Sequence, residues 1–271
     1  MEMKGFIRRE GLACGFSAVG FTSAEPVDGQ RHLEGAIRDG RIGSMAWLAR
    51  DPAARCDPRS ILPGARSVVC LALAYGKDGC RLGREPDDPA NPEGPPAPNG
   101  ETAKLARFAR GLDYHDVVRE KAQRLWDSVV KASPNSKAKI CVDTSPILEK
   151  ALARRAGIGW IGKHTVLVNE KFGSWLALGE IITDLLLKPD SPAADRCGDC
   201  RLCVDSCPAG ALVSPRELDS RRCISYLTIE AGGMGRAKEA KDVCGWRYGC
   251  DLCQEACPYN LVKAGQRHDA T

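Results

Sequence analysis

The sequence lacks any hydrophobic run long enough to cross a membrane. Its longest apolar stretches, SVVCLALAYG and SWLALGEIITDLLL, are too short or are interrupted by charge, whereas a spanning helix needs about 20 apolar residues. The first residues, MEMKGFIRRE, lack the apolar core of a secretory signal peptide. We therefore expect a cytoplasmic protein without membrane association, in a compartment where disulfides are rare.

The chain also lacks internal repeats and a strong net charge. No segment recurs at the period of a solenoid repeat. A formal net charge of +4 permits nucleic-acid binding but gives it little support. With 271 residues, 43% of them hydrophobic and 27% charged, the chain is expected to form one large globular domain or two smaller ones.

Cysteine, by contrast, is abundant, with 14 residues. The segment CGDCRLCVDSCP has the spacing C-x2-C-x2-C-x3-C-P, and CDLCQEACP has the spacing C-x2-C-x3-C-P. One further cysteine stands alone between the two runs. The eight cysteines are Cys197, Cys200, Cys203, Cys207, Cys223, Cys250, Cys253 and Cys257. Eight thiolates are the number that binds two [4Fe–4S] clusters.

The spacing also predicts how the eight thiolates divide. Three thiolates two residues apart lie on one tight loop and can bind three corners of a cubane, while the fourth, before proline, reaches the other cluster. One cluster is then bound by Cys197, Cys200, Cys203 and Cys257. The other is bound by Cys207, Cys223, Cys250 and Cys253. Zinc is the alternative, but structural zinc usually takes two separated cysteine pairs. The nearby Cys244 is expected to be an ordinary thiol.

Upstream of these cysteines, expected strands alternate with expected helices. A helix is expected near the start of the chain, followed by a strand over residues 16–25. The apolar, β-branched segment 66–76 is the strongest strand candidate, and residues 137–145 form another. Residues 115–132 are amphipathic at helical spacing, and residues 146–157 have the proline start and glycine stop of a helix.

This alternation predicts an α+β or α/β domain over residues 1–190. Residues 191–262 are expected to form a small ferredoxin-like domain with the two clusters, followed by a tail over residues 263–271. The proline-rich segment 84–100 is expected to be a long exposed loop within the first domain.

Several segments resemble one known family. The segment VDTSPILEKALARRAGIGWIGKHTVLVNEKFGSWLALGEIITDL resembles the central region of the epoxyqueuosine reductases. DPRSILPGARSVVCLAL, RGLDYHDVVREKAQRL, RCISYLTIE and GCDLCQEACPYN resemble further segments of that family, in the same order. The resemblance extends from about residue 5 to residue 262.

The resemblance implies a cobalamin-binding domain joined to the double [4Fe–4S] domain. The implied reaction is reduction of epoxyqueuosine to queuosine at the wobble position of tRNA, by cob(I)alamin generated through the clusters. The implied cofactors are cob(II)alamin, bound base-off, and two [4Fe–4S] clusters. The implied partners are the tRNA anticodon loop and an external electron donor of the flavodoxin or ferredoxin type, and a monomer is expected.

The resemblance also assigns roles to individual residues. Asp143 matches the general acid proposed for the family; the alternative is that it caps the helix beginning near Pro146. Tyr114 and His115 are expected to border the substrate pocket. The residues matching the cofactor site are Arg59, Trp160, Lys163, His164, Ser174, Ser225, Tyr226 and Thr228. The basic residues available for tRNA phosphates are Arg107, Arg110, Arg154, Arg155, Lys163 and Lys171.

Two features depart from the family pattern. Many members continue beyond the cluster module with a helical-repeat domain, whereas this sequence ends fourteen residues after Cys257, so a short form is expected. The proline-rich segment 84–100 is also longer than the usual connection. Two alternatives therefore stand beside the leading one. The first is a cobalamin-dependent reductase of a small molecule such as an organohalide, and the second is a non-enzymatic electron-transfer or cobalamin-carrying protein.

Overall fold

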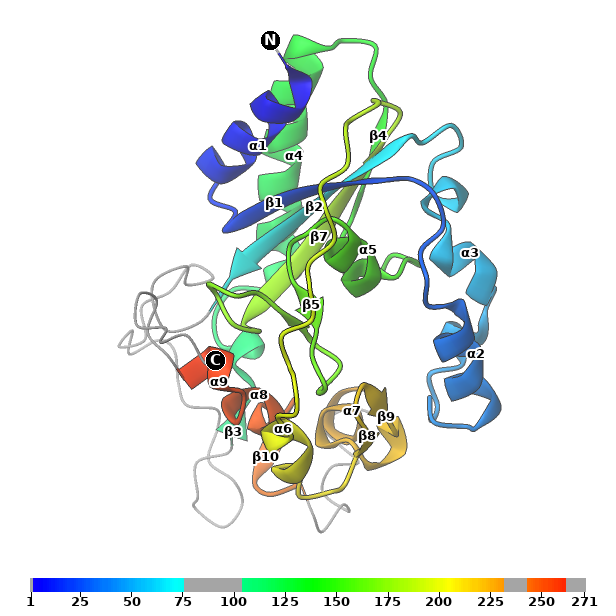
Figure 1. Cartoon of the computed structure of the whole chain (residues 1–271), viewed down its shortest axis with the longest axis vertical. Helices are drawn as coiled ribbons and strands as arrows, with labels where there is room; N and C mark the ends of the chain where they lie inside the picture. The colour runs from blue at the N-terminus through cyan, green and yellow to red at the C-terminus, as the bar shows by residue number, and fades with distance from the viewer. Residues whose placement is uncertain (1, 76–103, 232–242, 262–271) are drawn as a thin grey trace.

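The computed structural model describes residues 2–75, 104–231 and 243–261. The predicted proline-rich loop at 84–100 and the tail at 263–271 lie outside these residues. A four-stranded sheet crosses the upper half of the described structure (Figure 1). Its strands, in spatial order, are β1 (Ala18–Ser23), β2 (Ser67–Ala74), β7 (Leu176–Thr183) and β4 (Ala138–Cys141).

All three neighbouring strand pairs of this sheet are antiparallel. Strand β7 lies between β2 and β4, and both of these run opposite to it, so they end at the edge of the sheet where β7 begins. There Ala74 pairs with Leu176, and Cys141 pairs with Glu180. The expected mixed helix and sheet fold is confirmed, and because the neighbouring strands are antiparallel, the domain is of the α+β type.

Helices cover both faces of the sheet. Helices α1 (Met3–Ala13) and α4 (Tyr114–Ala132) lie on one face, and α5 (Glu149–Arg155) lies on the other (Figure 1). The side chains of β2 alternate between two hydrophobic clusters, one on each face of the sheet. Those on the α4 side are Val69, Leu71 and Leu73, and those on the α5 side are Val68, Cys70 and Ala72. Burial on both faces explains why β2 is a continuous apolar run.

Close packing of α5 depends on a glycine in β1. A Cβ on Gly20 would overlap the backbone carbonyl of Ala156, which directly follows α5. Only glycine therefore allows the end of this helix to approach the strand so closely. The smaller elements of this part are α2 (Gln30–Arg38), α3 (Pro52–Cys56), η1 (Ala46–Ala49), η2 (Pro58–Ser60), β5 (Trp160–Ile161) and β6 (Leu167–Val168).

The cysteine-rich module forms the lower part of Figure 1 and is made of short elements. They are α6 (Leu202–Asp205), β8 (Leu212–Ser214), β9 (Glu217–Leu218), η4 (Ser220–Arg222), α7 (Ile224–Ile229), β10 (Trp246–Tyr248), α8 (Leu252–Glu255) and α9 (Pro258–Leu261).

An earlier stretch of the chain completes this module. Strand β3 (Lys104–Leu105) pairs in parallel with β10, and η3 (Arg107–Ala109) follows it. Ala106 is fully buried in a small core with Ile224 and Trp246. Residues 104–109 therefore pack with the module, although they precede the domain boundary expected at residue 190.

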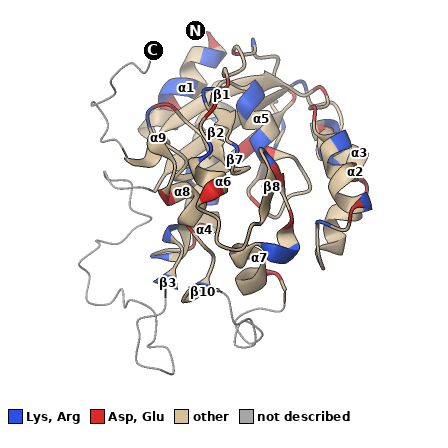
Figure 2. Cartoon of the chain, turned by 60° about the horizontal axis from the view of Figure 1, so that its bottom comes forward, with Lys and Arg blue, Asp and Glu red and all other residues tan. Residues whose placement is uncertain are grey.

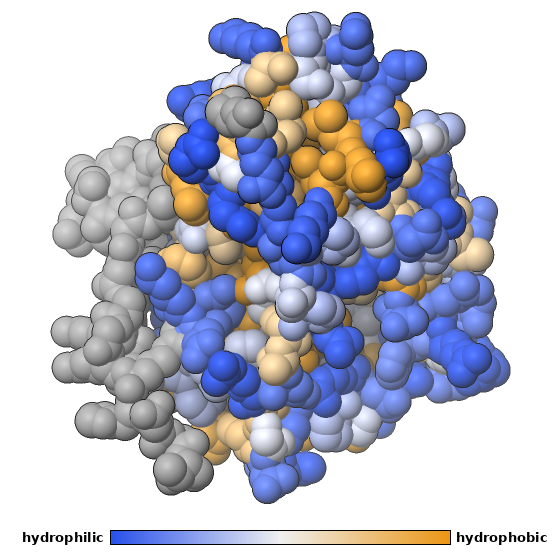
Figure 3. Space-filling view, turned by 45° about the horizontal axis from the view of Figure 1, so that its top comes forward, coloured by the Kyte–Doolittle hydropathy of each residue, from blue (hydrophilic) through white to orange (hydrophobic). Residues whose placement is uncertain are grey.

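The surface of the described residues is mostly polar. Hydrophilic side chains dominate the face seen in Figure 3, with one compact hydrophobic area near its top. Basic and acidic side chains are interspersed over α2 and α3, and basic side chains also lie on α5 and beside α7 (Figure 2). Among the described helices, none combines the length and the apolar character needed to cross a bilayer.

Candidate functional site

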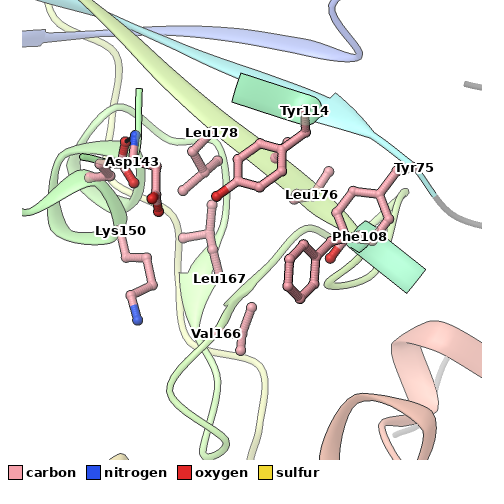
Figure 4. A pocket seen from close by; sticks show the side chains of 11 residues that line it. Tyr75, Phe108, Tyr114, Asp143, Lys150, Val166, Leu167, Leu176 and Leu178 are labelled. Atoms are coloured by element: carbon pink, nitrogen blue, oxygen red, sulfur yellow. Dashed lines mark hydrogen bonds between the residues drawn. The ribbon is translucent and has the colours of Figure 1, made fainter. Parts of the chain in front are cut away.

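A cavity of about 260 Å³ opens at the edge where β2 and β4 end and β7 begins (Figure 4). Its walls are mainly apolar and aromatic, with three charged side chains. The lining residues are Tyr75, Phe108, Tyr114, Asp143, Glu149, Lys150, Val166, Leu167, Leu176, Ala177 and Leu178. A largely apolar cavity with a few convergent polar groups is typical of a small-molecule or cofactor site.

Asp143 lies two residues after β4, as expected for a group at the end of a strand. Its backbone has φ +49°, a left-handed conformation that is uncommon for a residue other than glycine. Its amide N–H donates to Glu149 Oε1 at 2.7 Å. Its side chain is 49% exposed. Asp143 does not cap α5, because that helix begins at Glu149 without a side-chain cap.

A residue at the start of α4 contacts the Asp143 carboxylate. His115 Nε2 lies 3.0 Å from Asp143 Oδ2, and His115 Nδ1 lies 2.6 Å from Asp113 Oδ1. The hydroxyl of Tyr114 points toward Asp143 (Figure 4). Burial and then the negative charge of Asp143 raise the pKa of Tyr114, so the phenol stays protonated.

The thiols predicted for the first cluster lie together. Burial and then the negative charges of three other thiolates raise the pKa of Cys257 to about 11. These neighbours are Cys197, Cys203 and Cys200. Burial and then the negative charges of Cys197 and Cys200 likewise raise the pKa of Cys203. We call these four residues the first thiol set.

The thiols predicted for the second cluster form a separate group. After burial, the charges of Cys223 and Cys207 contribute to raising the pKa of Cys250 to about 11. Burial raises the pKa of Cys253 further, with contributions from Cys250, Cys223, Cys203 and Cys207. We call Cys207, Cys223, Cys250 and Cys253 the second thiol set. Because the charge of Cys203, a member of the first set, raises the pKa of Cys253, the two sets adjoin.

The geometry of the thiols differs from that around a single ion. The eight cysteines of the two thiol sets are free thiols. Within residues 2–75, 104–231 and 243–261, no three His, Cys, Asp or Glu side chains converge as the ligands of one metal ion do. In a [4Fe–4S] cluster each thiolate binds a different iron atom, so the sulfurs need not meet around one point.

Several N–H groups point at the thiols. Trp160 Nε1 donates to Cys197 Sγ at 3.3 Å, and the Ala211 amide donates to Cys207 Sγ at 3.3 Å. Cys223 precedes α7 and accepts from the first amides of that helix, those of Ser225 and Tyr226. These donors suit a sulfur that carries negative charge, because hydrogen bonds to cluster sulfurs stabilise the reduced state.

Two residues predicted at the cofactor site contact the cluster loops. Trp160 is 2% exposed, donates to Cys197 and packs edge-on against Tyr259 with ring centroids 4.8 Å apart. Lys163 Nζ donates to the carbonyl of Gly198 at 2.6 Å. Both side chains join the segment after α5 to the first thiol set.

Other predicted residues join elements within the protein. Tyr226 OH accepts the Ser44 amide at 2.6 Å and so joins α7 to the loop after α2. Ser174 is fully buried, and its Oγ donates to Gln254 Oε1 at 2.9 Å. Thr228 is also fully buried and accepts the Gly249 amide at 3.0 Å.

Arg59 and Ser225 lie away from the cavity lining. Arg59 is paired with Asp57 and Glu25 near α3. Ser225 lies in α7, where its amide points at Cys223. None of the eight residues predicted at the cofactor site lines the cavity described above.

His164 stands out among the predicted residues because part of its ring has no partner. The side chain is 3% exposed, and Nδ1 accepts the Val166 amide at 3.2 Å. Nε2 is buried and has no hydrogen-bond partner in the described residues. Burial, then the charge of Lys150, lowers the pKa of His164 to about 4, so the ring is neutral and Nε2 carries the hydrogen.

The glycines of this segment serve packing within the protein. A Cβ on Gly159 would overlap the carbonyl of Val168, and one on Gly162 would lie 2.8 Å from the His164 ring. Both glycines therefore allow close packing against residues of this same segment.

The basic residues predicted for tRNA phosphates are partly engaged. Arg155 donates to Thr22 and to the carbonyls of residues 23, 25 and 26, so it joins α5 to the end of β1. Arg110 donates twice to the carbonyl of Leu105. Arg107 stacks over Trp175 at 4.5 Å.

The sequence analysis missed several residues at the cavity. Tyr75 and Phe108 line it, and so do Glu149 and Lys150 at the start of α5. Tyr75 lies at the end of the best strand candidate, residues 66–76, and site residues are common at strand ends, so this signal was available. Phe108 lies in η3, a short 3-10 turn that follows β3. Strand β3 pairs with β10 of the cluster module, and no local sequence pattern predicts this pairing.

Family models match two parts of the chain. Residues 196–260 match the "4Fe-4S double cluster binding domain". Residues 55–144 match "Epoxyqueuosine reductase QueG, DUF1730". The epoxyqueuosine reductase of Xanthomonas campestris pv. campestris is 39% identical over 97% of this chain and 71% of its own. That of Escherichia coli strain K12 is 36% identical over 94% of this chain and 64% of its own.

Solved structures give the same result. The epoxyqueuosine reductase of Streptococcus thermophilus matches with a TM-score of 0.83 and 31% identity, over 99% of this chain and 69% of that one. An epoxyqueuosine reductase with a tRNA-Tyr epoxyqueuosine-modified stem loop matches with a TM-score of 0.80 and 34% identity, over 98% and 67%. A reductive dehalogenase at 16% identity, with a TM-score of 0.58, shares the fold.

The antiparallel α+β domain, its cavity and the appended double [4Fe–4S] module define a class of iron–sulfur oxidoreductases. Within that class, the chain belongs to the epoxyqueuosine reductase family. The resemblance noted in the sequence is thereby confirmed, and membership of an enzyme family decides against the non-enzymatic alternative.

Proposed function

We propose that this protein reduces epoxyqueuosine in tRNA to queuosine, at the cavity beside Asp143, with cobalamin and two [4Fe–4S] clusters as cofactors. The main support is the position of Asp143 at this cavity in a chain of the epoxyqueuosine reductase family. A relative of this family has been solved with an epoxyqueuosine-modified tRNA stem loop, which supports tRNA as the substrate here.

The residues fit the proposed cofactors. Two adjoining sets of four thiols, with N–H groups aimed at several of the sulfurs, suit two [4Fe–4S] clusters. The apolar walls from β6 and β7 suit the flat face of a corrin. The buried Nε2–H of His164, which has no partner in the described residues, is a donor available to an amide or phosphate of that cofactor. When bound, the clusters and the cobalamin supply the low-potential electrons that opening an epoxide needs.

The chain's own residues supply the proton and its position. We assign the proton to the Asp143 carboxyl, which lines the cavity and lies within reach of solvent. His115 orients that carboxyl through a hydrogen bond, and the Tyr114 hydroxyl points toward it. The leucine side chains of β6 and β7 exclude water from the opposite wall, so that the proton goes to the substrate oxygen.

The two thiol sets differ in their access to solvent and to the cavity. Cys200 of the first set is exposed. Cys250 of the second set packs against the small core that includes Phe108, and Phe108 lines the cavity. We therefore propose that an external donor of the flavodoxin or ferredoxin type reduces the first set's cluster, and that the second set's cluster lies on the cavity side.

The test is to purify the full chain anaerobically, add cobalamin and a reductant, and assay an epoxyqueuosine-modified tRNA stem loop. We expect conversion to queuosine, and slower conversion by the Asp143→Asn variant. A haloaromatic substrate in a parallel reaction tests the small-molecule alternative. Conversion of the haloaromatic but not of the stem loop, by protein loaded with clusters and cobalamin, overturns the proposal. The same preparation, passed over a sizing column with light scattering, tests the expectation of a monomer.

A further inference from the structure

A carboxyl group is buried beneath the site. Glu180 lies in β7, and its side chain is fully buried. It is on the α5-facing side of the sheet, as is Ile182 two residues on. Its neighbours across the sheet are Cys70 in β2 and Cys141 in β4. Neither carboxyl oxygen of Glu180 receives an N–H or hydroxyl donor from the described residues.

The group that Glu180 does contact is another carboxyl. Glu149, the first residue of α5, lines the cavity, and its carboxyl interacts with that of Glu180. Two carboxylates in contact inside a protein cannot both be ionised without a large cost, and a hydrogen bond between them requires a proton. Burial raises the pKa of Glu149 to about 7, and burial with the charge of Glu149 raises that of Glu180 well above its usual range.

Among the described residues, no cation is seen to form an ion pair with Glu149 or Glu180. The charge of Lys150 acts on Glu149, but its Nζ donates to the carbonyl of Thr165 at 3.0 Å. Arg155, also in α5, is occupied by Thr22 and the loop after β1. The flanking thiols of Cys70 and Cys141 have pKa values raised by burial, so they are neutral near pH 7. From the loop after β4, the charge of the Asp143 side chain further raises the pKa of Glu149.

Glu149 connects the pair to the catalytic aspartate. Its Oε1 accepts the Asp143 amide at 2.7 Å, and this bond holds a backbone that has φ +49°. The Asp143 segment is therefore fixed at its backbone by Glu149 and at its side chain by His115. In one Bacillus subtilis epoxyqueuosine reductase, the loop carrying the catalytic aspartate is swung out of the active site.

We propose that Glu149 and Glu180 share a single proton, and that in this state Glu149 positions Asp143 through its backbone amide. Glu180 donates its hydrogen to Glu149, which leaves the other Glu149 oxygen free to accept the Asp143 N–H. Glu149 and Glu180 are thus positioning residues. The inference rests on the proposed role of Asp143 as proton donor, and it deepens that role.

The shared proton has a spectroscopic signature that does not depend on the reaction. At pH 8 ordinary carboxyl groups are ionised, so the infrared carbonyl band of a protonated carboxylic acid should persist only for a buried pair. We expect this band in the full-length protein without cobalamin, and its loss in Glu180→Gln. The substitution keeps a neutral hydrogen-bond donor to Glu149, so the exchange of the Asp143 amide should stay slow. Absence of the band from the wild-type protein overturns the shared proton.

The positioning role is tested at Glu149. In Glu149→Ala the Asp143 amide loses its acceptor, so we expect its hydrogen exchange to accelerate and kcat to fall about 10- to 100-fold with KM little changed. Glu149→Gln should restore part of kcat, because its side-chain oxygen can accept the same N–H. Glu120→Ala, an exposed change on α4, is the matched control and should alter neither quantity.

The outcomes separate this inference from the proposed function. Unchanged amide exchange and kcat in Glu149→Ala overturn the positioning role. If the wild-type protein shows the infrared band and the slow exchange but converts no stem loop, the pair stands and the proposed function fails.

Discussion

His115 Nε2 lies 3.0 Å from Asp143 Oδ2, and this contact joins the start of α4 to the loop after β4. The two residues are 28 positions apart in the sequence: His115 lies in α4, which packs on one face of the sheet, and Asp143 follows the edge strand β4. His115 Nδ1 also lies 2.6 Å from Asp113 Oδ1, so the ring lies between two carboxylates. Such a ring both orients Asp143 and titrates in a useful pH range.

The first prediction concerns Asp143. Asp143→Asn keeps the size and the hydrogen bond to His115 but removes the acidic proton. We expect kcat for stem-loop reduction to fall about 10²- to 10⁴-fold, the usual contribution of a general acid. The cluster absorbance and the affinity for cobalamin should be unchanged, because the thiol sets and the apolar walls are untouched. Activity within twofold of wild type would remove Asp143 from the proton-donating role.

The second prediction concerns the pKa of His115. Burial alone lowers this pKa, but the hydrogen bonds to Asp143 and Asp113 outweigh it, and the pKa lies above its ordinary value of 6.5. Because the folded-state pKa is raised, the imidazolium stabilises the fold fully below pH 6.5, and this contribution is lost as the pH rises through the folded pKa. NMR titration of the ring should therefore give a midpoint above 6.5.

Removal of one carboxylate tests the cause of that shift. Asp113→Asn takes away the contact at Nδ1, so the midpoint of His115 should move down relative to wild type. Asp116→Asn, an exposed change one turn along α4, is the matched control and should leave the midpoint nearly unchanged. A midpoint that does not respond to Asp113→Asn would show that this contact does not govern the titration.

Much of the framework was accessible from the sequence because local patterns determine it. The segment that became β2 was the best strand candidate, and α4 buries Val118, Ala122, Leu125 and Val129 at the helical spacing predicted for it. The exchange of Cys207 and Cys257 between the two thiol sets also followed from spacing. It stays a prediction, although the thiols within each set lie near one another.

What the sequence could not give depends on long-range contacts. Strand β7 was noticed only as an apolar run, and nothing local places it between β2 and β4, where it makes the sheet antiparallel. Ser174, Tyr226 and Thr228 were assigned to the cofactor by resemblance, but each makes a hydrogen bond that joins two elements. Such a bond appears only when both partners are placed.

The third prediction concerns Cys223, the one cluster cysteine outside the two regular runs. It belongs to the second thiol set by its proximity to Cys207 and Cys250. In Cys223→Ser that set loses a ligand, so iron should fall from about eight toward about four atoms per chain. Cys244→Ser is the matched control, since Cys244 is an exposed cysteine of the same module. It should keep the full iron content. Equal iron in both variants would remove Cys223 from the ligand set.

The fourth prediction concerns Trp160. Its Nε1–H donates to Cys197 Sγ at 3.3 Å, and such a donor stabilises the more negative, reduced form of a cluster. Trp160→Phe removes the donor and keeps an aromatic ring against Tyr259. We therefore expect one of the two cluster potentials, measured by redox titration with EPR detection, to become more negative, while the other stays near its wild-type value.

The matched control for Trp160→Phe is Trp126→Phe, because Trp126 packs against the hydrophobic core beneath α4 rather than against a thiol. That change removes the same indole N–H and leaves a similar vacancy, but it should shift neither potential. If both variants shift a potential alike, loosened packing is the cause and the Trp160 hydrogen bond is not. A shift confined to Trp160→Phe ties the potential of the first set's cluster to this one N–H group, and makes Trp160 a residue that tunes electron entry.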